Sequence, residues 1–265
     1  MSTALAKDGA KLKFAVHGAG PLRIALTHSL AMDGDFWRPV IDELGEAATV
    51  VTWDCRGHGA SDKPPGPYTV ELFADDLAAV LDAAGMETVT AAGASMGGMV
   101  TLAFGLRRRE RVKALGLIDT TAWYGPDAPA DWQARAAKAK AEGFAALTAF
   151  QQTRWFSDAF RQAHPDVVRD CIGVFCANDL AAYAETCRML GAANLIDGLP
   201  QIAAPVAILV GEEDYATPVS MAEQLHEGIT GSTLEVIPAA RHLTPLERPD
   251  LIAARLLELA ERTAS

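Results

Sequence analysis

The sequence predicts an α/β fold with a mostly parallel central sheet, helices on both faces and a helical lid insertion. In the first half of the 265 residues, short apolar runs alternate with segments of helical periodicity. Near-continuous apolar strands separated by helices indicate a parallel sheet that is buried on both faces. A stretch at about 122–199 interrupts this alternation because it contains no convincing strand. We therefore expect a core at 1–121, a helical lid at 122–199 and the rest of the core at 200–265.

The expected strands are short apolar segments bounded by turn residues. They cover residues 11–16, 23–28, 48–54, 88–93, 112–119, 205–211 and 232–238. Helical periodicity marks residues 35–44, 70–84, 96–106 and 249–262. The insertion is rich in alanine, arginine and aromatic residues, which predicts several helices. Inserted between two strands of a parallel sheet, these helices would cover the carboxyl ends of the strands, where such sheets bind ligands.

Composition and charge limit the classes of partner. A hydrophobic content of 50% and a charged content of 22% are typical of globular proteins, and no apolar run is long enough for a membrane span. The net charge of −11 disfavours binding to nucleic acid or to an anionic membrane. No signal-peptide pattern or zinc-ligand spacing is visible. We expect a cytoplasmic protein with a small-molecule partner and no metal; the oligomeric state stays open.

The segment Gly93-Ala-Ser-Met-Gly has the pattern G-x-S-x-G between an expected strand and an expected helix. A serine on such a tight turn is held in a strained conformation that exposes its hydroxyl, and small neighbours let strand and helix approach closely. The same serine lies at a helix N-terminus, where unpaired N–H groups stabilise negative charge. Ser95 is therefore the candidate nucleophile.

A serine nucleophile needs a base and an acid that orients the base. Asp214 follows the expected strand at 205–211, and His242 follows the one at 232–238. The chain order Ser95, Asp214, His242 is the order nucleophile, acid, base that accompanies a G-x-S-x-G motif. All of them come at carboxyl ends of strands, so they can converge on one edge of the sheet. Asp119 also ends a strand and is the main rival for the acid, and Glu212 and Glu213 compete as well.

The tetrahedral intermediate of such a reaction needs N–H donors for its oxyanion. Met96, the residue after the nucleophile, is expected to supply one of them. The other is expected from the loop His28-Ser-Leu after the strand at 23–28. The backbone N–H of Leu30 is the candidate, and that of Ser29 competes with it.

Taken together, these segments resemble the α/β-hydrolase superfamily over nearly the whole chain. The resemblance rests on His28-Ser-Leu, on Asp54-x-Arg-Gly-His-Gly-x-Ser-Asp, on Gly93-Ala-Ser-Met-Gly-Gly, on Gly211-x-x-Asp and on Ala240-Arg-His-Leu. The glycine-rich turn after Asp54 is expected to be structural. Within the superfamily the chain is most similar to 3-oxoadipate enol-lactonases. That likeness lies in Ser29-Leu, Asp119-Thr-Thr-Ala, Trp132-x-x-Arg, Arg154-Trp-Phe, Tyr183, Cys187 and His242-Leu.

The resemblance implies hydrolysis of an enol-lactone that carries a free carboxylate, by a serine triad and without a cofactor. Such a substrate needs an apolar pocket with one or two fixed cations. Arg135 and Arg154 lie in the aromatic-rich lid near Trp132 and Trp155, and arginine binds carboxylates bidentately. We expect these four residues to contact the substrate. Against this, the arginines could be ordinary solvated helix residues.

Other activities use the same motifs. A general carboxylesterase or perhydrolase would use the triad with a less selective pocket, and a carbon–carbon bond hydrolase would use it on a dienoic diketone. A binding protein that keeps the fold but not the catalysis is a further possibility. Arg241, which precedes His242, stands where the family usually has a small residue. Its side chain could pair with an acidic neighbour or reach a substrate carboxylate.

Overall fold

The computed structural model describes residues 1–263, in which eight strands form one sheet. The strand order is β1-β2-β4-β3-β5-β6-β7-β8. β1 and β2 pair antiparallel, and β2 pairs antiparallel with β4, whereas the remaining pairs are parallel. The strands are β1 (Ser2–Leu5), β2 (Lys11–His17), β3 (Leu22–Thr27), β4 (Ala48–Trp53), β5 (Val89–Ala94), β6 (Val112–Ile118), β7 (Val206–Gly211) and β8 (Thr233–Ile237).

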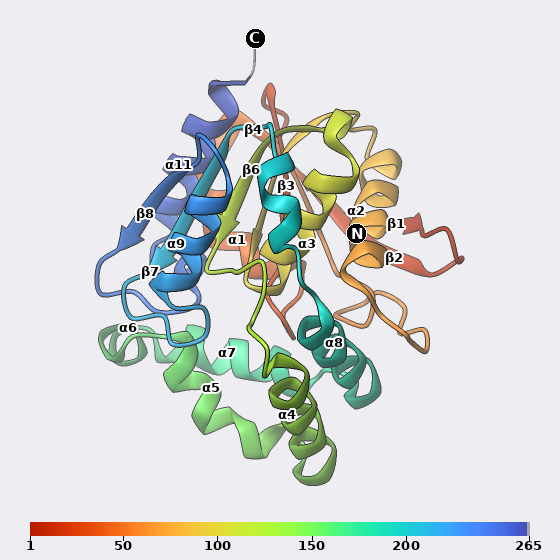
Figure 1. Cartoon of the computed structure of the whole chain (residues 1–265), viewed down its shortest axis with the longest axis vertical. Coiled ribbons are helices and arrows are strands. Elements are labelled where there is room, and N and C mark those ends of the chain that lie inside the picture. Colours follow the sequence, from red (N-terminus) through yellow and green to blue (C-terminus); the bar gives the residue numbers. More distant parts are fainter. Residues whose placement is uncertain (264–265) are drawn as a thin grey trace.

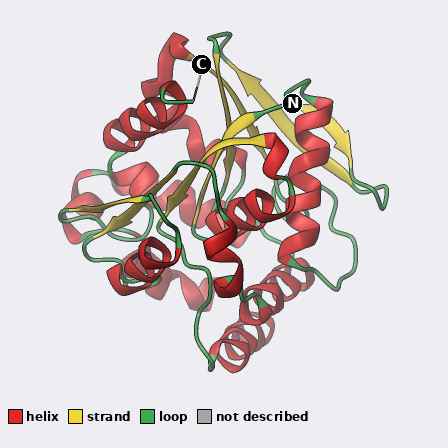
Figure 2. Ribbon diagram, turned by 45° about the horizontal axis from the view of Figure 1, so that its top comes forward, coloured by secondary structure: helices red, strands yellow, loops and turns green. Residues whose placement is uncertain are grey.

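Helices cover both faces of the sheet (Figure 2). On one face α1 (Arg38–Leu44) packs against α11 (Pro249–Glu261), and α11 lies along the central strands. The other face carries α2 (Val70–Ala83), α3 (Met96–Arg107) and α9 (Val219–Gly228). Short 3-10 segments at Gly34–Trp37, Gly45–Ala47, Arg109–Arg111 and Ile196–Gln201 connect these elements. β4, β5 and β7 are buried along their whole length, as expected for strands covered on both sides.

The insertion between β6 and β7 forms a layer of helices at the lower end of the view in Figure 1. It contains α4 (Ala128–Glu142), a 3-10 turn at Phe144–Leu147, α5 (Thr148–Trp155), α6 (Asp158–Ala163), α7 (Pro165–Cys176) and α8 (Leu180–Ala192). α4 packs against α8, and α5 and α7 pack together. The short α10 (Thr244–Glu247) follows β8 in the core. None of the helices described is both long and apolar enough to cross a membrane.

The structure differs from the sequence expectations in three elements. β1 and α9 were not expected: β1 is only four residues long at the sheet edge, and α9 buries little of its surface. The helix expected at 35–44 is divided into a 3-10 turn and α1. Pro39 lies in the first turn of α1, where its missing N–H costs no hydrogen bond.

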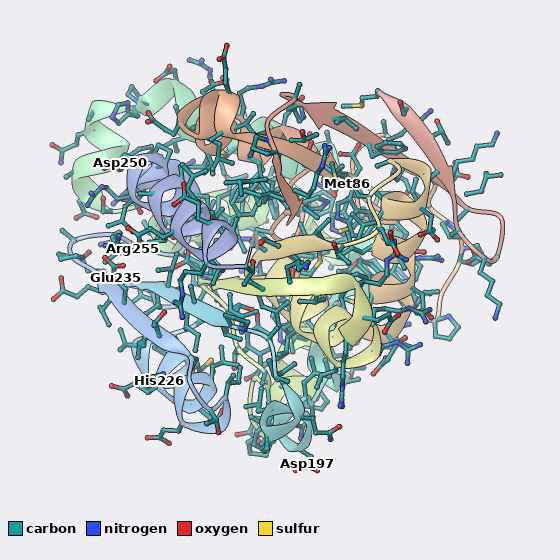
Figure 3. The ribbon with its side chains drawn as sticks, turned by 90° about the horizontal axis from the view of Figure 1, so that it is seen from above. Met86, Asp197, His226, Glu235, Asp250 and Arg255 are labelled. Atoms are coloured by element: carbon teal, nitrogen blue, oxygen red, sulfur yellow. The ribbon has the colours of Figure 1, made fainter. Side chains whose placement is uncertain are left out.

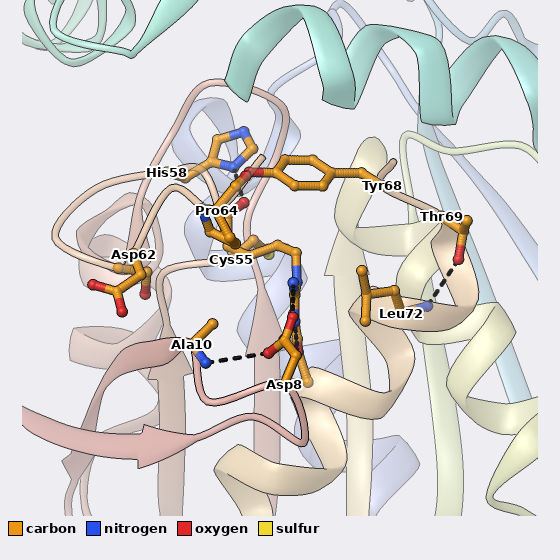
Figure 4. Close-up of polar contacts among 12 residues, drawn as sticks. Asp8, Ala10, Cys55, His58, Asp62, Pro64, Tyr68, Thr69 and Leu72 are labelled. Carbon is orange, nitrogen blue, oxygen red and sulfur yellow. Dashed lines mark hydrogen bonds and ion pairs between the residues drawn. The ribbon is translucent and has the colours of Figure 1, made fainter. Parts of the chain in front are cut away.

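The turn after β4 is held by its own polar side chains, as expected from the sequence. Asp54 accepts hydrogen bonds from Gly34 N (2.8 Å) and Ala60 N (2.8 Å). The buried Arg56 guanidinium donates to Asp76 on α2 (2.5 and 2.6 Å) and to Asp8 (2.8 Å). In Figure 4 Asp8 lies beneath the turn that carries Cys55 and His58. The turn therefore ties the N-terminal hairpin to α2.

The C-terminal helix is joined to the edge strand of the sheet. Arg255 of α11 pairs with Glu235 of β8, with Nη2 3.2 Å from Oε1 (Figure 3). Both side chains are partly exposed, so this pair contributes little to stability by itself.

Candidate active site

Ser95 lies on a tight turn between β5 and α3. Its backbone has φ 54° and ψ −117°, a conformation that is strained for a residue with a side chain. A Cβ atom on Gly97 would lie 2.1 Å from the carbonyl oxygen of Thr27, and one on Gly93 would lie 2.1 Å from that of Gly97. The glycines are therefore required because strand, turn and helix pack without room for side chains. The Thr120 hydroxyl, which donates to Ser95 O (2.6 Å), fixes the turn from β6.

Ser95, His242 and Asp214 form a continuous hydrogen-bonded chain. The Ser95 hydroxyl lies 2.9 Å from His242 Nε2, and His242 Nδ1 lies 2.8 Å from Asp214 Oδ2. A carboxylate only accepts, so this contact assigns the imidazole proton to Nδ1 and leaves Nε2 to accept from Ser95. All three side chains are buried. The arrangement can activate a serine hydroxyl by passing its proton to the imidazole.

The environment of Asp214 favours its charged form. Ala216 N (2.7 Å) and Thr217 N (2.9 Å) donate to Oδ1, and the Thr217 hydroxyl donates to Oδ2 (2.8 Å). Burial opposes the charge, but His242 and the Thr217 donors outweigh it and lower the pKa of Asp214 below its usual value. The carboxylate is thus a fixed acceptor that orients the imidazole.

Asp119, the rival acid, lies nearby but holds the backbone instead. Its Oδ1 accepts from Gly211 N (3.1 Å), and its Oδ2 accepts from Thr244 N (2.9 Å) and the Thr244 hydroxyl (2.7 Å). Burial and the neighbouring Asp214 raise the pKa of Asp119 well above its usual range. Asp119 therefore connects the ends of β6 and β7 to the segment after His242.

The two glutamates that compete for the acid role in the sequence point away from the imidazole. Glu212 accepts a hydrogen bond from Ala239 N (3.0 Å), and Glu213 accepts one from Arg241 Nε (3.3 Å). Of the four acidic candidates, Asp214 is therefore the one whose carboxylate contacts His242.

The loop expected to complete an oxyanion hole is held by His28. The buried imidazole accepts from Cys55 N at Nε2 (3.0 Å), so its Nδ1–H donates to Ser29 O (2.8 Å). Burial lowers the pKa of His28, which keeps the ring neutral in this role. Within residues 1–263, the backbone N–H groups of Leu30 and Met96 have no hydrogen-bond acceptor. Both amides are thus available for a ligand oxygen.

A cavity of about 650 Å³ lies between the lid and the core. Its wall includes none of Ser95, His242 and Asp214 and is connected to Ser95 through Tyr124. Tyr124, Ala216 and Met221 form its core side, and α4 and α5 of the lid form the other. Tyr124 interacts with the Ser95 side chain, and burial raises the pKa of this phenol to about 12. The lining from the lid is Ala128, Asp131, Trp132, Ala134, Arg135, Lys138, Leu147, Phe150, Gln151 and Arg154.

Arg135 and Arg154, expected at the substrate, both line this cavity. Arg135 donates from Nε to the Tyr183 hydroxyl (2.8 Å) and lies over the Trp132 ring at 5.1 Å. Arg154 is half-buried and lies over the Phe150 ring at 5.6 Å. Among the described residues, neither guanidinium forms an ion pair with a carboxylate. Burial, with the charge of Arg135 nearby, lowers the pKa of Arg154 to about 10, so it stays cationic at neutral pH.

The tryptophans expected at the substrate lie in different places. Trp132 lines the cavity and packs edge-to-face on Tyr124, with ring centroids 5.2 Å apart. Trp155 does not line it, because the residue after Arg154 points to another side of α5. Its ring is buried inside the lid against Phe156 and Phe175. Trp155 thus contributes to the packing of the lid.

Comparison with known proteins identifies the family. Residues 23–249 match the family model of the alpha/beta hydrolase fold. The chain belongs to the α/β-hydrolase family. It is 32% identical to 3-oxoadipate enol-lactonase 2 of Acinetobacter baylyi over 93% of this chain and 91% of that protein. 3-Oxoadipate enol-lactonase 1 of the same organism is also 32% identical, over 86% and 84%.

Solved structures agree with this family. The enol-lactonase of Burkholderia xenovorans LB400 superposes with a TM-score of 0.92 at 30% identity and covers 97% of this chain and 99% of its own. A thermophilic esterase of Thermogutta terrifontis, solved with malate bound, has a TM-score of 0.92 at 28% identity, covering 100% and 99%. This α/β-hydrolase is thus similar to enzymes named both lactonases and esterases.

In this α/β-hydrolase Arg241 fastens the lid to the segment that carries His242. Its Nη1 donates to the carbonyl oxygens of Thr153 (2.9 Å) and Phe156 (3.0 Å) at the end of α5. The guanidinium also pairs with Asp158 (3.0 Å) and Glu213 (3.3 Å). The structure therefore places Arg241 with acidic neighbours rather than at the cavity, whose lining does not include it.

Two residues of the cavity wall were not anticipated from the sequence. Tyr124 lies in the connection after β6, between Ser95 and the lid arginines. Gln151 is buried on α5 in the lining of the cavity. Neither belongs to a motif, and a tyrosine or glutamine in a helical insertion has many ordinary roles. Only the placement of the lid over the sheet identifies them.

Proposed function

We propose that this chain is a serine hydrolase that opens a small carboxylate-bearing enol-lactone, such as 3-oxoadipate enol-lactone, with Ser95, His242 and Asp214. The observation that carries this proposal is the cavity that Tyr124 connects to Ser95, whose wall holds Arg135 and Arg154 without an ion-paired carboxylate in the described chain. A half-buried cation without a counter-ion favours an anionic ligand. The wall also holds Lys138 and one carboxylate, Asp131, so its charged side chains are mostly positive, whereas the chain as a whole has a net charge of −11.

In the proposed reaction His242 takes the Ser95 proton while Oγ attacks the lactone carbonyl. Asp214 holds the imidazole in place and stabilises its charged form. The N–H groups of Met96 and Leu30 stabilise the oxyanion. When the ring C–O bond breaks, His242 returns the proton to the enol oxygen, and the enol can become a ketone.

The product of this first half stays attached to Ser95 as an ester, because Oγ has replaced the ring oxygen on the acyl carbon; the enol that leaves this carbon remains part of the same molecule. His242 then takes a proton from water, whose oxygen attacks the acyl carbonyl. The bond to Oγ breaks, and the proton on His242 returns to Ser95. The released product carries a new carboxylate, and no cofactor is consumed.

A general carboxylesterase is the second candidate. It is supported by the cavity volume of about 650 Å³, which exceeds what a small lactone fills, and by the likeness to an esterase. Both candidates share the proposed nucleophile and differ in what the lid selects. A cytoplasmic location and the absence of nucleic-acid and membrane partners stay predictions.

The test is hydrolysis of 3-oxoadipate enol-lactone, a neutral lactone and a short p-nitrophenyl ester by the wild type and by Ser95→Ala and Arg154→Met variants. We expect Ser95→Ala to lower kcat by about 10⁴-fold or more on every substrate. Arg154→Met should raise KM for the anionic lactone by about 10²-fold and leave the neutral substrates unchanged. Serine-dependent turnover of only the neutral substrates would favour the carboxylesterase. No serine-dependent turnover would overturn both.

A further inference from the structure

The wall of the cavity contains a buried amide without a partner. Gln151 is 1% exposed, and its Oε1 receives no hydrogen bond from any residue that the structure describes. A buried polar atom without a partner destabilises the fold relative to one that is hydrogen-bonded. Packing does not require an amide here, because an apolar side chain of the same shape avoids that cost. A buried polar atom without a partner calls for an explanation, and because Gln151 lines the cavity a ligand can supply the missing partner.

The position of Gln151 relates it to the cation of the proposed site. Gln151 and Arg154 are three residues apart on α5, so their side chains lie on the same face of the helix. Both line the cavity, with Arg135 and Trp132 opposite them on α4. Gln152, the next residue, lines a different surface depression with Arg161 and Asp158. The helix thus presents one glutamine to the cavity and its neighbour to solvent.

We propose that Gln151 is a specificity-determining residue that donates an amide hydrogen bond to the substrate carboxylate beside Arg154. This inference rests on the proposed function, because it assumes that the substrate carries a carboxylate. It does not depend on which lactone or ester the substrate is. Because no partner fixes the orientation of the amide, it can turn its N–H₂ group toward an acceptor. Arg154 then supplies the positive charge, and Gln151 supplies a directional hydrogen-bond donor. A substrate that ends in a methyl group has no acceptor for this donor.

The test compares two esters of equal chain length, mono(p-nitrophenyl) adipate and p-nitrophenyl hexanoate, which differ in having a terminal carboxylate or a methyl group. The variants are Gln151→Met, Gln151→Glu and the matched control Gln152→Met. We expect Gln151→Met to raise KM for the adipate ester about tenfold, with kcat and the hexanoate KM changed less than about twofold. Gln151→Glu should raise the adipate KM further, because it places a negative charge beside the carboxylate. Gln152→Met should match the wild type.

Thermal stability separates binding from a structural role. If Gln151 binds substrate, Gln151→Met removes an unpartnered buried amide, so Tm should be unchanged or higher. A lower Tm with equal losses on both esters would overturn the inference, as would an unchanged adipate KM. An adipate KM that Gln151→Glu leaves unchanged would contradict the donor role. If the wild type keeps a Gln151-dependent preference for the adipate ester but does not open the enol-lactone, the proposed substrate fails and this inference stands.

Discussion

The carboxyl edge of the sheet and the lid above it contribute to the same site in different ways. At the sheet edge, Ser95, Asp214 and His242 follow β5, β7 and β8, and their atoms meet within hydrogen-bonding distance. In the lid, Arg135 and Arg154 come from helices α4 and α5 and are held by aromatic rings and a phenol. The first region is fixed by a shared sheet register, and the second by helix packing and by hydrogen bonds of single side chains.

Because the two regions are built differently, substrate selectivity can change in the lid without a change of the chemistry at the sheet edge. A parallel sheet delivers residues after its strands to one edge whatever the loops contain. A helical insertion has no such frame, so its surface can vary while the geometry of Ser95, His242 and Asp214 stays the same. The similarity to both an enol-lactonase and an esterase fits this division. The comparison fails if sheet-edge substitutions alter selectivity or lid substitutions abolish the chemistry.

The largest effect on kcat should come from one of the two buried carboxylates of the sheet edge, Asp214, and not from the other, Asp119. Asp214→Asn should lower kcat by about 10⁴-fold, because the amide no longer favours the imidazole tautomer that accepts from Ser95. Asp119→Asn should change kcat by less than about tenfold and lower the unfolding free energy by about 2 kcal/mol, since it loses an acceptor for Thr244 or Gly211. Steady-state kinetics and urea unfolding measure the two quantities. Equal losses of kcat would mean that both carboxylates serve His242.

A smaller effect should come from the junction between the two regions. Arg241→Met removes the donors to Thr153 O and Phe156 O and the pairs with Asp158 and Glu213. We expect it to lower the unfolding free energy by about 2 kcal/mol and to speed proteolysis of the lid. The control is Arg188→Met on α8, whose exposed pair with Glu185 should contribute less than about 0.5 kcal/mol. Equal stability of the two variants would show that Arg241 does not fasten the lid.

Much of the sheet edge could be predicted from the sequence because its determinants are local. The glycines beside Ser95 are demanded by packing within a few residues, and Asp214 and His242 each follow an apolar strand. The choice between Asp214 and Asp119 was harder, since both end a strand. Their hydrogen-bond partners differ and favour Asp214: it contacts His242, whereas Asp119 accepts from the backbone of Gly211 and Thr244.

The lid could be predicted as helical but not in its detail. Helical periodicity does not say which side of α5 faces the core, so Arg154 and Trp155 were expected at the same site although they point apart. Gln151 belongs to no sequence motif, because its role depends on which residues lie across the cavity. β1 was missed because four edge residues carry too little pattern. These features are decided by tertiary packing, which local patterns do not record.

The smallest effect should appear in the pH dependence of the core beneath the site. His58 is buried, with Nδ1 3.0 Å from Arg56 O (Figure 4), and burial together with His28 lowers its pKa to about 3. The unfolded chain takes up this proton near pH 6.5 and the folded chain does not, so stability falls as pH drops from about 6.5 toward 3. His58→Asn keeps a donor for Arg56 O but cannot titrate. Relative to the wild type, the variant should therefore gain about 1.6 kcal/mol of unfolding free energy between about pH 6.5 and 5, measured by urea unfolding. A difference that stays constant with pH would mean that the folded core accommodates a charged imidazole. The core beneath the sheet edge would then be less strictly fixed than its hydrogen bonds indicate.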